Sequence, residues 1–262
     1  MPHISVIMSV FNEQPHFLET ALESILKQTF RDFEFLIVND GSNQKITEIL
    51  TQYANRDSRV RLLKNEKNIG LTKSLNVAIR EAKGEYIARM DSDDIALSNR
   101  FQQQLSTLKQ GFFDLICGNY LLINENSHPL REKILILPTN IRESLMKGNI
   151  FIHATFFGKR DVFLEYYDET FRRAQDYEFL LRIIAKGYRL GLTEKSILQY
   201  RIHTSAISAH SAKEQEWYAI KARWRAITKY GYSKKYYVYL IRSFFILLLP
   251  YRLKKILVLK QQ

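Results

Sequence analysis

The alternation of short apolar runs with amphipathic stretches over residues 4–90 is the feature that most constrains the fold of this chain. Four runs have the length of buried strands, and apolar side chains recur between them at helical spacing. Strands that alternate with helices in this way predict an α/β fold with a mostly parallel central sheet and helices on both faces. The expected strands lie at residues 4–10, 35–38, 60–63 and 85–90, and Gly84 is expected to cap the helix before the last one.

Polar side chains follow three of these four expected strands. The carboxyl ends of parallel strands lie at one edge of a sheet, and ligands bind beyond that edge. We therefore expect these side chains to meet in one crevice. They are Asn12 and Glu13, Asn39 and Asp40, and the run Asp91-Ser92-Asp93-Asp94.

The run Asp91-Ser92-Asp93-Asp94 is the sharpest chemical signal in the sequence. Three carboxylates within four residues repel one another unless a cation lies among them. Carboxylate oxygens are hard ligands that suit Mg²⁺ or Mn²⁺. A solvated turn is the alternative, because Asp is common in turns, but the position after a buried strand favours a metal site.

The positive charge of the chain is concentrated near its C-terminal end. Residues 1–150 carry 18 basic and 18 acidic side chains, whereas residues 213–262 carry 12 basic and 2 acidic ones. A nucleic-acid-binding protein would spread its basic surface more widely. The local charge favours contact with an anionic membrane surface or another polyanion, and no nucleic-acid partner is expected.

The second half of the chain has less regular elements. The apolar run at residues 236–249 contains Arg242 and is shorter than the ~20 residues that span a bilayer. Its basic flanks favour a helix that lies in the membrane interface, and packing against the rest of the chain is the alternative. Helices are expected at residues 101–108, 177–184 and 212–230, and strands at 115–123 and 197–200.

The single cysteine, Cys117, lies in an apolar run and is expected to be a buried core thiol. The chain therefore has no internal disulfide, which suits a reducing compartment. Residues 1–6 have the pattern of a first strand and lack the basic start of a signal peptide.

Four motifs occur in order along the first half of the chain, and together they resemble those of family 2 glycosyltransferases. The resemblance covers roughly residues 3–210. It implies a GT-A fold, with a Rossmann-like sheet, a nucleotide-diphospho-sugar donor and a divalent metal, Mg²⁺ or Mn²⁺. The motifs are Ser9-Val10-Phe11-Asn12-Glu13, Val38-Asn39-Asp40-Gly41-Ser42, Asn68-Ile69-Gly70-Leu71, and the segment from Gly84 to Asp94.

The resemblance assigns expected roles on the donor side of the site. Phe11 stands where the family has an aromatic residue that stacks on the base, and Asp40 where a carboxylate accepts a hydrogen bond from the base, normally uracil. Asp91 matches the carboxylate that the family places near the ribose, and Asp93 matches the direct metal ligand. The expected donor-binding set is Ser9, Phe11, Glu13, Asp40, Gly70, Lys73, Asp91 and Ser92.

Structural alternatives remain open for several of these residues. Phe11 could be a core residue, Asp40 a turn former, and Gly70 a loop glycine without a ligand. Lys73 could lie near the phosphates, but a solvated helix face is favoured for it. Asp94 could assist the metal site or cap the next helix.

On the acceptor side, Asp176 stands where the resemblance implies the catalytic base, and N-capping of a helix is its alternative. Gln175 replaces the Glu that usually precedes this base, which puts the role of residue 175 in doubt. His203 matches a histidine that touches the metal or the diphosphate, and a structural role is its alternative. Arg201 is expected to support the site, and a structural role is favoured for His153.

The sequence therefore predicts an inverting, metal-dependent glycosyltransferase. It would move a sugar, most simply from a UDP-sugar, to a hydroxyl of a glycan or lipid-linked acceptor in bacterial surface polysaccharide synthesis, as for lipopolysaccharide, capsule or exopolysaccharide. A catalytic domain is expected over residues 1–212 and a basic, helical, partly apolar extension over residues 213–262. The expected location is cytoplasmic, peripheral at the inner membrane.

Two other classes are weighed against this prediction. A nucleotide-sugar-binding domain without catalysis would share the fold, but it would not need an intact set of carboxylates. A nucleotidyltransferase would need a glycine-rich basic loop after the first strand, and Phe11-Asn12-Glu13-Gln14-Pro15 is not one.

Overall fold

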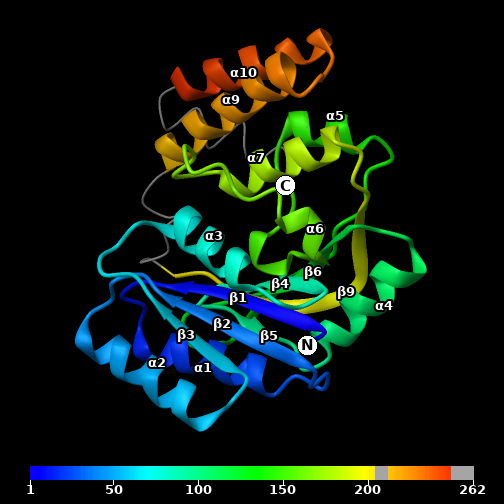
Figure 1. The fold of residues 1–262 in the computed structure, drawn as a ribbon. Coiled ribbons are helices and arrows are strands. Elements are labelled where there is room, and N and C mark those ends of the chain that lie inside the picture. Colours follow the sequence, from blue (N-terminus) through cyan, green and yellow to red (C-terminus); the bar gives the residue numbers. More distant parts are fainter. Residues whose placement is uncertain (204–211, 249–262) are drawn as a thin grey trace.

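The first half of the chain forms the parallel part of the central sheet. In the computed structural model, which describes residues 1–203 and 212–248, four strands pair in the order β3-β2-β1-β4 with parallel ladders (Figure 1). These strands are β1 (Ile4–Val10), β2 (Phe33–Asn39), β3 (Val60–Lys64) and β4 (Tyr86–Arg89). The helices between them are α1 (Pro15–Leu26), α2 (Gln44–Arg56) and α3 (Leu71–Glu81).

Side chains alternate between the two faces of this sheet, because successive residues of a strand point in opposite directions. On β1, Val6 and Met8 belong to the hydrophobic core under α1 and α2, whereas Ile7 belongs to the core under α3. Figure 1 shows α1 and α2 on one face and α3 on the other. The prediction of a sheet covered on both faces is confirmed.

Beyond β4 the sheet becomes mixed. The next strands follow in the order β8-β6-β9-β5, and β7 pairs with β6. The β6–β9 ladder is parallel, while the shorter β4–β8, β6–β8, β6–β7 and β5–β9 ladders are antiparallel. The bounds are β5 (Ile95–Ala96), β6 (Leu115–Ile123), β7 (Pro129–Lys133), β8 (Phe157–Lys159) and β9 (Leu190–Arg201).

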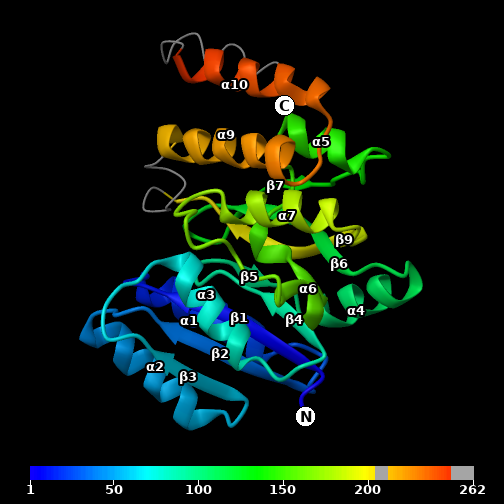
Figure 2. The same ribbon diagram turned by 45° about the horizontal axis from the view of Figure 1, so that its top comes forward.

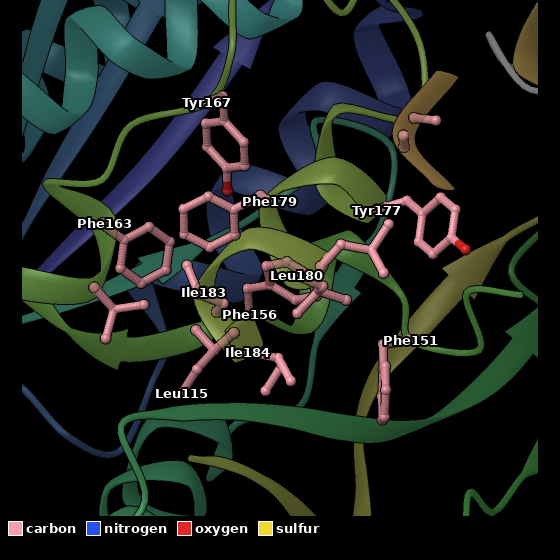
Figure 3. Packing of buried hydrophobic residues seen from close by; sticks show 14 of the residues in the cluster. Leu115, Phe151, Phe156, Phe163, Tyr167, Tyr177, Phe179, Leu180, Ile183 and Ile184 are labelled. Carbon is pink, nitrogen blue, oxygen red and sulfur yellow. The ribbon is translucent and has the colours of Figure 1, made fainter. Parts of the chain in front are cut away.

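Helix α7 (Gln175–Ala185) is the centre of the second hydrophobic core, which is the core that α3 covers. Its side chains Phe179, Leu180 and Ile183 are fully buried and pack among Phe156 and Phe163 (Figure 3). The other helices of the central part are α4 (Arg100–Gln110), α5 (Ile141–Lys147) and α6 (Arg160–Phe163), and a 3₁₀ turn lies at His153–Thr155.

The C-terminal part forms a helical hairpin on top of this core. Helix α9 (Ala212–Lys229) packs on α7, and α10 (Tyr237–Leu248) follows the 3₁₀ turn Lys234–Tyr236 and packs on α9 (Figures 1 and 2). Ala222 and Ala226 of α9 are fully buried in the same hydrophobic core as α7. No helix among residues 1–203 and 212–248 is long and apolar enough to cross a membrane. The basic residues of the predicted extension beyond Leu248 lie outside the described residues.

The role predicted for Gly84 is wrong. Helix α3 ends at Glu81 with Ala82 as its cap, and Gly84 instead lies against the backbone of β1. A Cβ atom on Gly84 would lie 2.5 Å from the backbone nitrogen of Ser5, and the Gly84 N–H donates to Ser5 Oγ at 2.8 Å. The glycine is required by this close approach of two chain segments, which local sequence does not reveal.

Candidate active site

An acidic cluster follows β4 at the carboxyl edge of the sheet. Asp91, Asp93 and Asp94 each offer a carboxylate oxygen, and these oxygens lie within 4.8 Å of one another. Asp91 forms an ion pair with Arg89, whose side chain is buried in the last position of β4. Asp94 accepts a hydrogen bond from the backbone N–H of Arg201 at 2.8 Å and does not cap the next helix.

The end of β9 completes this cluster. His203 Nε2 lies 2.8 Å from Asp93 Oδ2, and this contact raises the pKa of the imidazole. The Arg201 guanidinium is buried, donates to the backbone oxygen of Asp93 at 2.7 Å and stacks on the ring of Phe17. Arg201 thus fixes the backbone of the cluster, as the sequence predicts.

The chemistry of the cluster fits a divalent cation. Asp94 Oδ2 is a buried carboxylate oxygen that has no hydrogen-bond partner among the described residues. Burial, together with the charges of Asp93 and Asp91, raises the pKa of Asp94 well above its usual value. A cation bound among these oxygens would relieve that repulsion and give Asp94 a partner, as Mg²⁺ or Mn²⁺ does in carboxylate sites.

Glu13 reaches the cluster from the segment that follows β1. Its Oε2 accepts a hydrogen bond from Ser92 Oγ at 3.2 Å, and burial followed by the charge of Asp93 raises its pKa. The predicted meeting of the polar segments after β1 and β4 is therefore present in the structure.

Asp40 organises the loop before α3. Its carboxylate is almost fully buried and accepts hydrogen bonds from the backbone N–H groups of Ile69 and Gly70, both at 2.9 Å, and from Asn65 Nδ2 at 2.8 Å. Gly70 has φ of 90° and ψ of 156°, a conformation that favours glycine. Asp40 thus links the end of β2 to the start of α3, and its contact with a base stays a prediction.

The remaining donor-side residues differ in exposure. Phe11 lies just after β1 and is 49% exposed, so it is not the core residue that its alternative reading required. Ser9 is half-buried in β1. Lys73 is exposed on α3, which agrees with the solvated helix face favoured for it.

Asp176 lies in the first turn of α7, and the cap residue of that helix is Ala174. The N-cap alternative for Asp176 is therefore wrong. Asn149 Nδ2 donates a hydrogen bond to Asp176 Oδ2 at 2.9 Å. Burial raises the pKa of Asp176, and the charges of Arg89 and Asp91 also act on it, so the carboxylate lies near this ion pair.

Two charged groups near the acidic cluster, Arg89 and Arg100, were not found by sequence reasoning. Arg89 lies in an apolar strand pattern, and the Arg100 guanidinium, also buried, donates to its backbone oxygen at 2.7 Å. His153, for which the sequence favours a structural role, contacts the hydroxyl of Tyr167 at 2.7 Å, and its burial lowers the pKa of the imidazole well below its usual value. The sequence holds one signal for Arg89, which is a charged residue inside an otherwise apolar strand pattern.

Solved structures show which class of fold this is. The chain is similar to S. aureus TarS 1-349 in complex with UDP-GlcNAc, with a TM-score of 0.67 and 19% identity over 88% of this chain and 68% of that one. It is also similar to the mannosyltransferase PcManGT from Pyrobaculum calidifontis in complex with GDP-Man and Mn²⁺, with a TM-score of 0.67 and 16% identity over 94% and 70% of the two chains. The protein therefore has the GT-A type of glycosyltransferase fold.

Sequence comparison then gives the family. The family model of Glycosyl transferase family 2 matches residues 5–167, and the chain belongs to this family. An uncharacterized glycosyltransferase of Methanocaldococcus jannaschii is 33% identical over 98% of this chain and 93% of its own length. The O-antigen biosynthesis glycosyltransferase WbnJ of Escherichia coli is 34% identical over 78% of this chain and 81% of its own length.

Proposed function

We propose that this family 2 glycosyltransferase moves a sugar from a nucleotide-diphosphate donor, most simply a UDP-sugar, to a hydroxyl of a glycan or lipid-linked acceptor with inversion. The observation that supports the proposal is that Asp176 is a buried carboxylate near enough to Arg89 and Asp91 for their charges to shift its pKa, while Asp91 belongs to the acidic cluster with Asp93 and Asp94. The names of WbnJ and of the diphosphoundecaprenol glucosyltransferase WfgD, both of Escherichia coli, support an acceptor in bacterial surface polysaccharide synthesis.

The donor would lie along the carboxyl edge of the sheet. Phe11 offers an exposed ring face for the base, and the loop that Asp40 holds borders the same edge. Asp93 and its acidic neighbours, with His203, would hold a divalent cation, which when bound neutralises charge on the diphosphate leaving group. The UDP-GlcNAc complex of TarS and the GDP-Man and Mn²⁺ complex of PcManGT support this class of donor.

Asp176 would act as the base in a single displacement. Its carboxylate takes the proton of the acceptor hydroxyl while the acceptor oxygen forms a bond to the anomeric carbon. The bond from that carbon to the diphosphate breaks, and the nucleoside diphosphate leaves with the electron pair. Attack on the face opposite the leaving group inverts the anomeric configuration, and a positioned base contributes about 10²–10⁴-fold to the rate.

The variant Asp176→Asn tests the proposal directly. We expect transfer to fall by about 10²–10⁴-fold, while binding of UDP-sugar with Mn²⁺, followed by calorimetry, stays within error of the wild type. Asp161→Asn is the matched control, because Asp161 is an exposed carboxylate in the first turn of α6. Full transfer by Asp176→Asn would contradict the proposed base, and donor binding without transfer by the wild type would favour the alternative of a binding domain.

We also propose that the hairpin of α9 and α10 binds the cytoplasmic face of the inner membrane peripherally. Trp217 and Trp224 of α9 are 53% and 51% exposed, and their rings contact Phe244 and Tyr237 of α10 edge-on. Phe245 of α10 is 66% exposed. Aromatic rings favour the headgroup level of a bilayer, and each nearby Lys or Arg contributes ~1 kcal/mol at an anionic surface.

The positive charge around these rings favours an anionic membrane as the partner of this surface. Residues 213–262 carry the excess of basic side chains, and Lys234, Lys235 and Arg242 are exposed at or beside α10. An anionic bilayer matches both the rings and the charge, whereas a second copy of the chain would bring like charges together.

The variant that carries Trp217→Gln, Trp224→Gln and Phe245→Gln tests the membrane surface. We expect its binding to vesicles that contain anionic phosphatidylglycerol to fall about tenfold or more, and wild-type binding to weaken in high salt. Phe112→Gln is the control, because Phe112 is an exposed ring at the end of α4. Unchanged vesicle binding, or a dimer that the triple variant abolishes, would refute the membrane surface.

A further inference from the structure

Asn149 contacts the carboxylate of Asp176, and neither composition nor spacing draws attention to it. It lies in the loop between α5 and the 3₁₀ turn at His153–Thr155. Its Nδ2 donates to Asp176 Oδ2 at 2.9 Å, and its Oδ1 accepts the backbone N–H of Phe151 at 3.0 Å. Because a backbone N–H can only donate, the oxygen of the amide must face Phe151, and the NH₂ group must face Asp176.

The loop that carries Asn149 is held on both sides. Phe151 is buried in the second hydrophobic core, where it fixes the chain two residues after Asn149 (Figure 3). The last carbonyls of α5 are also tied down, because Tyr177 Oη donates to the oxygen of Leu145 and Arg223 Nε donates to the oxygen of Met146.

These ties involve the C-terminal hairpin. Arg223 is a buried residue of α9, and its Nη1 donates to Ser243 Oγ of α10 at 2.9 Å. Helices α7, α9 and α10 therefore together fix the end of α5, from which the Asn149 loop departs. An amide placed by so many contacts is pre-organised and does not need to move when substrate binds.

We infer that Asn149 is a positioning residue for Asp176: it holds one carboxylate oxygen in place and leaves the other to take the proton of the acceptor hydroxyl. This inference rests on the proposed role of Asp176 as the base. A neutral donor to a carboxylate also favours its ionised form, which is the form that accepts a proton.

On balance, the surroundings of Asp176 raise the pKa of its carboxyl and oppose its ionisation. Burial raises the pKa of the carboxyl, and the charge of Asp91 raises it further. The Arg89 guanidinium and the backbone N–H groups at the start of α7 act in the opposite direction. The other titratable groups that its charge affects are Tyr167, Tyr177 and Cys117. The hydrogen bond from Asn149 acts in the same direction as Arg89 and these N–H groups, because it also favours the ionised carboxylate.

The variants Asn149→Ala and Asn149→Asp test the inference. For Asn149→Ala we expect kcat to fall by about 10–100-fold with little change in the KM for the donor, and the acid limb of the pH profile of kcat to move to higher pH. Asn149→Asp keeps the shape of the side chain but places a second carboxylate against Asp176. The two cannot both ionise readily, so this variant should lose more activity than Asn149→Ala and recover part of it as pH rises.

Asn140→Ala is the matched control. Asn140 caps the start of α5 by accepting the N–H of Glu143 at 3.0 Å, so its loss weakens the same helix without touching Asp176. We expect a lower unfolding midpoint and an unchanged pH profile. An Asn149→Ala enzyme with a wild-type pH profile, or an equal shift in Asn140→Ala, would overturn the positioning role. The proposed function fails separately, if Asp176→Asn retains transfer.

Discussion

At the residue scale, the site depends on a few side chains that hold the backbone around it in place. Asp40 fixes the turn before α3 through the N–H groups of Ile69 and Gly70. Arg201 fixes the acidic turn through the backbone of Asp93, while Asp94 is held by the backbone of Arg201. Each contact joins segments that lie far apart in the chain, so the crevice has a defined shape before any substrate arrives.

The backbone of Gly70 gives the first residue-scale prediction. Its φ of 90° and ψ of 156° lie in a region that residues with a Cβ rarely adopt. We expect Gly70→Ala to destabilise the fold by about 1–3 kcal/mol in urea unfolding, and to weaken donor binding because the turn at Asp40 is displaced.

Gly148→Ala is the control for this prediction. Gly148 has an extended φ of 166°, and a Cβ atom there would meet nothing within 4 Å. The free energy of unfolding of Gly148→Ala should therefore differ little from that of the wild type. Equal losses in both variants would show that the conformation of Gly70 is not the cause.

At the element scale, α1 and α2 are joined by a cluster of charged and phenolic groups. Glu23 of α1 accepts from Tyr53 Oη of α2 at 3.0 Å and forms ion pairs with Arg56 of α2 and Lys27. The Arg56 guanidinium, with these other donors, lowers the pKa of Glu23 to about 2.

This shift predicts a pH-dependent contribution to stability. Because the folded pKa lies below the ordinary value, the contribution is present above about pH 4.5 and is lost as pH falls towards 2. Glu23→Gln should cost about 1 kcal/mol in the free energy of unfolding at pH 7, since the pair is partly solvated. The difference from the wild type should shrink in acid, and a constant difference from pH 7 to pH 2.5 would contradict this linkage.

At the scale of the whole molecule, the helical hairpin shares one hydrophobic core with one face of the sheet. Residues of α9 are buried with α7, and Arg223 bridges α5, α9 and α10. The division at residue 212 stays a prediction, but the described part of the C-terminal extension is packed against the domain that holds Asp176.

Binding of a divalent cation should stabilise the whole folded chain, because the unfolded chain has no acidic cluster to bind it. With UDP and Mn²⁺ at about 100 times the dissociation constant, the linkage contributes about 2.7 kcal/mol and raises the thermal midpoint. Asp93→Asn should remove most of the Mn²⁺-dependent rise, and a chelator should reverse it in the wild type. Glu48→Gln, on the exposed surface of α2, should behave as the wild type. A full rise in Asp93→Asn would place the cation elsewhere.

Local sequence pattern was enough to predict the elements that bury their own apolar faces. Alternating periodicity gave the four parallel strands and their helices, because an element must bury its own apolar face. Chain order then placed Asn12, Asp40 and Asp91 at one edge, because parallel strands share their carboxyl end. Helices α7 and α9 were also predicted, with bounds close to those observed.

Tertiary structure alone decided what depends on partners distant in the chain. The short strands β5, β7 and β8 have too little sequence to show a period and exist only because longer strands pair with them. Arg89 and Asn149 gain their roles from the carboxylates beside them, and Gly84 from the backbone of β1. Those contacts form only once the chain is packed. Hydrogen bonds and close approaches between distant segments leave no period in the sequence, so local pattern does not reveal them.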